Sequence, residues 1–183
     1  MVTPESVDNR KDLLLLILAA NDSAPIVGVT RLQKYLYLLQ EQLGWKSRLK
    51  TTYDFQAYDF GPFDDQVYAD LEFLENLGLI EKAPAGEEPP AETGESRAAS
   101  ESWATSDPEF APWEEDEEVW QYRLTPKGRG FVERLRLDRS DREVIEDLKQ
   151  QWNGRPLAQL LRWLYTTYPA TAVNTKLTHL RSS

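Results

Sequence analysis

A long acidic segment divides this 183-residue chain and limits what the rest of it can fold into. Residues 83–119 contain twelve acidic side chains and a single Arg, among repeated Pro, Ser, Ala and Gly. A segment of this composition does not bury enough apolar surface to offset the entropy lost on ordering. We therefore predict a disordered insertion within one domain, since the chain is too short for two full domains.

The segments on both sides of the insertion have the pattern of β-strands. Leu79-Ile80-Glu81-Lys82 precedes it and Trp120-Gln121-Tyr122-Arg123-Leu124 follows it, so the insertion is predicted to be the enlarged tip of a hairpin. Helices followed by a two-stranded hairpin are typical of a winged helix. We expect a mainly α fold with a small β-hairpin, in which residues 8–137 form a winged-helix core.

Two helices are expected near the start of the chain. The first follows a cap at Asp8 or Asn9, and its six consecutive apolar residues from Leu13 to Leu18 indicate burial on nearly all sides. The second is predicted to begin at an N-cap, Thr30, and to carry one apolar stripe. That stripe consists of Leu32, Tyr35, Leu36, Leu39 and Leu43.

An aromatic segment and a third helix complete the part before the hairpin. Residues 53–60 are predicted to form a short strand that ends in a Gly61-Pro62 turn. The helix that follows should cover residues 64–76 and end at Gly78. Its apolar side is predicted to consist of Val67, Tyr68, Leu71 and Leu74.

Three further helices are expected after the hairpin. Thr125-Pro126 supplies an N-cap and a proline at the first helical position for a helix to about Leu137. Residues 138–168 should form a helical pair, whose first helix has capping-box spacing between Ser140 and Glu143. The pair is expected to pack against the core or against a second copy, which leaves a homodimer open, and residues 169–183 are expected to form a tail.

Two motifs in this pattern resemble a known family. Leu32-Gln33-Lys34-Tyr35-Leu36-Tyr37 is similar to the leucine-glutamine-lysine, apolar pair, tyrosine motif of Panacea (SocA-like) antitoxin domains and YwgA-like winged-helix proteins. Ala57-Tyr58-Asp59-Phe60-Gly61-Pro62 is similar to the turn before their next helix. Tyr58 replaces the usual tryptophan, and Phe60 replaces the usual tyrosine and so removes a hydroxyl. The likeness covers residues 10–82 and continues from the return strand to about 137.

The resemblance implies a non-enzymatic domain that neutralises or regulates a partner protein, often in toxin–antitoxin or antiviral settings. The structural alternative is that the motif residues only pack in the core or shape a turn. Both interpretations stay open for Leu32, Gln33, Lys34, Tyr58, Gly61 and Pro62.

The composition excludes much enzyme chemistry. The chain has no cysteine and one histidine, His179, near its end, so thiol nucleophiles, Cys/His zinc sites and a mid-chain Ser-His triad are absent. No phosphate-binding loop or dinucleotide motif is present either, and we expect neither an enzyme nor a cofactor. The apolar run from Leu13 to Ala20 is too short to span a bilayer, so we expect a cytoplasmic protein without a membrane partner.

DNA binding is the alternative function, because winged helices often read the major groove. The third helix opposes it, since residues 63–81 contain six carboxylates and no Lys or Arg, and carboxylates repel phosphates. A phosphate-binding surface beside the wing is the remaining route to DNA; the alternative is that its basic residues form solvated and intramolecular ion pairs, some with the acidic helix or insertion. Its candidates are Arg123, Lys127, Arg129, Arg134 and Arg136.

The preferred hypothesis is a protein partner with a basic surface. Large aromatics in an acidic, disordered segment suit folding onto a basic and apolar groove of a partner, such as a toxin or a defence effector. The alternative for this segment is a solvated linker whose aromatics touch their own domain. The candidate partner-binding residues are Trp103, Phe110 and Trp113 in the insertion and Asp64 and Asp65 at the third helix.

Overall fold

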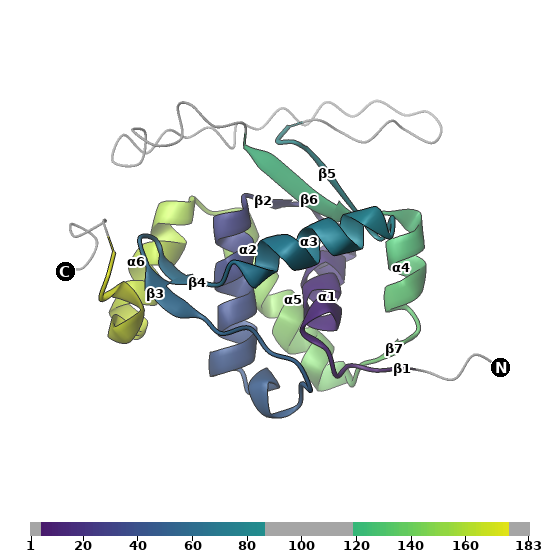
Figure 1. Cartoon of the computed structure of the whole chain (residues 1–183), viewed down its shortest axis with the longest axis horizontal. Helices are drawn as coiled ribbons and strands as arrows, with labels where there is room; N and C mark the ends of the chain where they lie inside the picture. Colours follow the sequence, from purple (N-terminus) through teal and green to yellow (C-terminus); the bar gives the residue numbers. More distant parts are fainter. Residues whose placement is uncertain (1–4, 87–118, 176–183) are drawn as a thin grey trace.

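The computed structural model describes residues 5–86 and 119–175. Helices dominate this part of the chain and the strands form small sheets, as expected for a mainly α protein with a little β-structure (Figure 1). The predicted insertion, with Trp103, Phe110 and Trp113, lies outside the described residues except at its two ends. His179 also lies outside them.

Helix α1 (Arg10–Ser23) is the centre of the core. The side chain of Asn9 accepts a hydrogen bond from Lys11 N at 3.0 Å, and Asp12 Oδ2 accepts one from Asn9 N at 3.1 Å, which together make a capping box. Every residue from Leu13 to Leu18 is buried. The predicted cap and all-round burial of this helix are therefore confirmed.

The predicted hairpin is present and belongs to a three-stranded sheet. Strands β5 (Ile80–Pro84) and β6 (Trp120–Leu124) pair antiparallel, with Glu81 opposite Arg123. Strand β2 (Ile26–Val27) pairs with the other edge of β6, so the strand order is β2-β6-β5. The sequence did not reveal β2 because two residues are too few for an alternating pattern to appear.

Helix α2 (Val29–Tyr37) continues into a π-helical turn, η1 (Leu38–Gln42), and a 3-10 turn, η2 (Trp45–Ser47). The predicted cap at Thr30 is wrong, because the helix begins at Val29 after Gly28. The predicted burial of Leu43 is also wrong, since its side chain is 46% exposed. A π-turn holds more residues than an α-turn, so it rotates later side chains out of the stripe.

The aromatic segment forms a hairpin of its own. Strands β3 (Gln56–Tyr58) and β4 (Gly61–Phe63) pair antiparallel, with Tyr58 opposite Gly61. The predicted single strand over 53–60 is therefore wrong: Gly61-Pro62 begins the second strand, and helix α3 (Gln66–Asn76) follows it. Gly61 has a φ of +86°, a backbone conformation that favours glycine at the sharp reversal.

Helix α4 (Pro126–Val132) begins as predicted and ends early. Thr125 Oγ1 accepts a hydrogen bond from Gly128 N at 3.0 Å, and Pro126 occupies the first helical position. The expected extension to Leu137 is wrong, because strand β7 (Leu135–Arg136) pairs there with β1 (Glu5–Ser6).

The last two helices, α5 (Arg139–Asn153) and α6 (Leu157–Thr167), pack into the same core as α1. A short 3-10 turn, η3 (Pro169–Ala172), follows them. The capping box predicted at Ser140 is wrong, because Asp138 is the N-cap residue and makes no side-chain cap bond. Lys149 of α5 joins the helices, since its buried ammonium donates to Leu18 O at 3.0 Å and Ala20 O at 2.8 Å.

Candidate partner-binding surface

The carboxylates predicted to make α3 acidic have different roles in the structure. Asp70 is buried, and its carboxylate pairs with Arg10 Nε at 2.7 Å and Lys11 Nζ at 3.4 Å. Burial alone would raise the pKa of Asp70, but the two cations outweigh it and the pKa lies below its usual value. Asp70 therefore ties α3 to α1 and presents no charge to a partner.

Asp64, a predicted partner-binding residue, is also engaged within the chain. Its Oδ1 accepts a hydrogen bond from Gln66 N at 2.9 Å and its Oδ2 accepts one from Asp54 N at 2.7 Å. The first of these bonds satisfies a backbone N–H at the start of α3. Glu81 is paired as well, with Arg123 across the β5–β6 ladder.

Three carboxylates remain on the exposed side of α3. Asp65, Glu72 and Glu75 are exposed, and none forms an ion pair with a basic side chain of the described residues. Asp65 was among the residues predicted to contact a partner. The structure therefore narrows the acidic helix face to these three positions.

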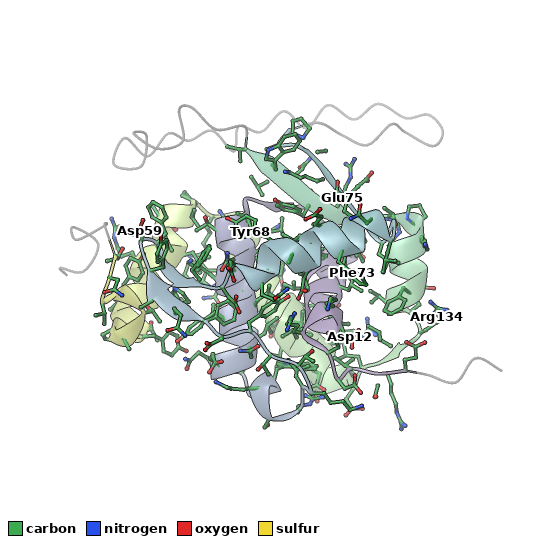
Figure 2. All side chains as sticks on the ribbon, in the orientation of Figure 1. Asp12, Asp59, Tyr68, Phe73, Glu75 and Arg134 are labelled. Atoms are coloured by element: carbon green, nitrogen blue, oxygen red, sulfur yellow. The ribbon has the colours of Figure 1, made fainter. Side chains whose placement is uncertain are left out.

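Large aromatic side chains lie among the three carboxylates. Tyr68 is 47% exposed and Phe73 is 49% exposed, and Figure 2 shows both on α3, with Glu75 on the same helix. The predicted packing of Tyr68 in the apolar stripe is therefore wrong. The fourth buried position of the helix is taken by Asp70, whose ion pairs compensate its burial.

The β3–β4 hairpin extends this aromatic surface. Because side chains alternate across a strand, Gln56, Tyr58 and Phe63 lie on one face of the hairpin and Ala57 and Pro62 on the other. The Tyr58 ring is 54% exposed and lies 5.2 Å from the Phe63 ring, which lies 6.1 Å from the Tyr68 ring. We call these four aromatics and three carboxylates the α3–hairpin surface: Tyr58, Phe63, Tyr68, Phe73, Asp65, Glu72 and Glu75.

An open groove of about 580 Å³ lies between the start of α3 and the hairpin face that carries Gln56, Tyr58 and Phe63. Its lining combines two aromatic side chains with three carboxylates and one guanidinium. The lining residues are Arg10, Thr52, Asp54, Gln56, Tyr58, Phe63, Asp64, Asp65 and Gln66.

The two family-like motifs contact each other directly. Lys34 Nζ donates to Pro62 O at 2.8 Å, and Gln33 Oε1 accepts from Asp64 N at 2.9 Å. A Cβ at Gly61 would lie 3.0 Å from Tyr165 Cε1, so glycine permits the close approach of α6. Leu32 is fully buried, whereas Tyr58 is exposed. The motifs thus fix the hairpin against α2, and Tyr58 alone of these residues is presented outward.

Lys34 is a buried lysine without a carboxylate partner among the described residues. Its Nζ donates one hydrogen bond, to the carbonyl oxygen of Pro62. Burial lowers the pKa of Lys34 to about 7. The sequence contains no signal for this burial other than the motif itself, because a lysine in a helix is ordinarily assigned to the solvent side.

Three of the five basic candidates for phosphate binding have polar partners within the chain, and a fourth, Arg134, lies over the Phe131 ring at 5.3 Å. Arg123 pairs with Glu81, Lys127 Nζ donates to Leu77 O at 2.6 Å, and Arg129 donates to Leu124 O at 3.3 Å. Arg134 and Arg136 are exposed beside β7, and Figure 2 shows Arg134 at the α4 side of the molecule, away from Tyr68. Arg123 is therefore half-buried and paired, whereas Lys127, Arg129, Arg134 and Arg136 are exposed.

No family model matches the chain, and no curated protein matches its sequence. Within residues 5–86 and 119–175, no group of three or more potential ligand side chains is placed to hold a metal ion. In the same part of the chain, no helix has the length and apolar character needed to cross a membrane.

Proposed function

We propose that this protein is a non-enzymatic, cytoplasmic regulator that binds a partner protein through the α3–hairpin surface, as an antitoxin-like protein or an accessory of a bacterial defence system. The observation that carries the proposal is an aromatic cluster in which Phe63 joins the half-exposed rings of Tyr58 and Tyr68, with the half-exposed Phe73 further along α3, beside carboxylates that form no ion pair among the described residues. Exposed aromatic clusters mark interaction sites, and aromatics commonly hold most of an interface's affinity. The carboxylates favour a partner with a basic surface.

We further infer that the core is a winged helix. The order α1, β2, α2, α3, β5, β6 supports this assignment, as does the strand order β2-β6-β5 with the hairpin at one edge. In that arrangement α3 stands where the recognition helix of a DNA-binding relative would lie. Here the helix carries Asp65, Glu72 and Glu75 on its exposed side, which favours protein over DNA.

The toxin-neutralising form of the proposal is tested in cells. The reading frames on either side of this gene are expressed singly and together with this protein. We expect one neighbour to arrest growth when expressed alone and to be neutralised by co-expression. If neither neighbour is toxic and neither binds the purified protein, the antitoxin-like proposal is wrong.

Single substitutions in this protein then show whether the partner identified in this way binds the α3–hairpin surface. Tyr68→Ala and Phe73→Ala are each expected to weaken binding about 30-fold, equivalent to about 2 kcal/mol, mainly through faster dissociation. Leu43→Ala is the matched control, because Leu43 is 46% exposed and lies outside the α3–hairpin surface. Surface plasmon resonance measures both rate constants. Equal dissociation rates for all three variants would place the docking surface elsewhere.

Binding to DNA, the alternative function, is measured with the same protein. We expect only weak, non-specific binding to a duplex at about 150 mM salt, because α3 presents carboxylates and the chain has a formal charge of −10. Fluorescence anisotropy of a labelled duplex gives the affinity. Tight binding that falls steeply with salt and is abolished by Arg134→Ala with Arg136→Ala would favour the DNA-binding alternative.

A further inference from the structure

We propose that the groove between the β3–β4 hairpin and the start of α3 receives an arginine side chain of the partner protein. This inference rests on the proposed function and names the chemical group that the partner inserts. It is carried by three features of the groove: exposed ring faces, carboxylates without basic partners, and a backbone held in place from beneath.

The ring faces come from the register of the hairpin. Tyr58 stands opposite Gly61, which has no side chain to cover it, and its ring instead approaches the diagonal neighbour Phe63 at 5.2 Å and an interplanar angle of 31°. Both residues line the groove, together with Gln56 from the same face. The Tyr58 ring is therefore available to stack against a planar group.

The charge of the groove favours a cation. Asp54, Asp64 and Asp65 line it with one basic residue, Arg10, whose guanidinium is already paired with the buried Asp70. Asp64 is occupied by two backbone N–H groups, whereas the carboxylates of Asp54 and Asp65 form no ion pair among the described residues. Two carboxylates therefore remain for a guest.

Arginine fits this combination better than lysine. A guanidinium is planar, stacks on an aromatic face and donates through several N–H groups to carboxylates at once. An ammonium is more strongly hydrated and lacks the planar face. The positive end of α3 opposes any cation, but Asp64 already accepts from Gln66 N at that end.

The groove is organised before a partner arrives. Lys34 holds Pro62 O and Gln33 holds Asp64 N, so buried side chains of α2 support both the hairpin and the start of α3. A site whose backbone is held in advance loses less entropy when its guest binds.

The first test uses Nα-acetyl-arginine amide as the probe and Nα-acetyl-citrulline amide as its neutral isostere. The ¹⁵N-labelled full chain is titrated with each compound and followed by NMR. We expect saturable shifts of the Tyr58, Asp65 and Gln66 amides with the arginine compound and much smaller shifts with citrulline. Non-saturable shifts, or equal responses to the two compounds, would overturn the proposal.

Variants connect the response to the groove. Asp65→Asn and Tyr58→Ala are each expected to weaken binding of the arginine probe about threefold or more, as loss of a carboxylate contact or of ring stacking implies. Glu72→Gln is the matched control, since Glu72 lies on α3 outside the groove lining. Unchanged amide spectra away from the substitution verify that each variant is folded. Equal probe affinity for all three variants would place the probe elsewhere and overturn the proposal.

Binding of the variants to the partner protein shows whether this inference or the proposed function fails. If Phe73→Ala weakens partner binding while Asp65→Asn and Tyr58→Ala do not, the docking surface stands and the arginine inference fails. If the probe binds the groove as expected but no partner binds the α3–hairpin surface, the proposed function fails while the arginine site stands.

Discussion

Replacing Gly128 by alanine is expected to lower the free energy of unfolding by about 3 kcal/mol, because the new methyl group would overlap the backbone of Leu79. A Cβ at this position would lie within 2.9 Å of Leu79 C and 3.3 Å from Leu124 Cδ2, and would overlap Leu79 O. That carbonyl cannot move freely, since it accepts a hydrogen bond from Thr125 N at 3.1 Å. The close approach of α4 to the start of β5 therefore requires glycine.

Gly130 is the matched control in the same helix. A Cβ there would meet no atom within 4 Å, so Gly130→Ala should leave stability unchanged or raise it by up to about 1 kcal/mol through helix propensity. Urea denaturation of both variants measures the difference. Similar midpoints for the two variants would contradict the packing of α4 on Leu79.

The free energy of unfolding is expected to rise as the pH is raised from 7 to about 9.5, because two lysines are buried without acidic partners among the described residues. Lys34 donates to one carbonyl oxygen and Lys149 to two, and burial lowers the pKa of each to about 7. Each regains its ordinary pKa of 10.5 on unfolding.

The sign of this dependence follows from proton binding. Between pH 7 and 10.5 the unfolded chain holds protons that the folded chain has lost, so raising the pH stabilises the folded state. Each lysine contributes up to about 1.4 kcal/mol per pH unit within this window. The buried Tyr122 acts in the opposite sense, because burial raises its pKa to about 12. Its contribution to the free energy of unfolding is therefore lost as the pH rises above about 10, where the tyrosine of the unfolded chain ionises.

Substitution isolates the contribution of each lysine. Lys34→Met or Lys149→Met should each remove about half of the slope between pH 7.5 and 9.5, measured by urea denaturation at several pH values. Lys46→Met is the control and should leave the slope unchanged, because Lys46 is exposed and its pKa is raised. A wild-type slope equal to that of Lys34→Met would show that Lys34 is not a buried neutral amine above pH 7.

Local patterns in the sequence predicted those elements that depend on residues close together in the chain. The cap at Asn9, the apolar run from Leu13 to Leu18, and the Thr125-Pro126 start of α4 all act within one or two helical turns. The strands flanking the acidic insertion were also predicted correctly, because each is long enough to show a strand pattern.

A local π-turn and contacts between distant segments decided the features that the sequence patterns did not predict. The π-turn in α2 moved Leu43 to the surface, and the pairing of β1 with β7 ended α4 early. Asp70 took a core position because Arg10, sixty residues away, neutralises it. The register of the β3–β4 hairpin selected Tyr58 and Phe63 for the surface, and α2 holds that hairpin through Gln33 and Lys34. The sequence alone therefore determined the main helices and the two strands beside the insertion, whereas tertiary packing decided the short strands and which carboxylates and aromatics face solvent, because these depend on partners that local spacing does not encode.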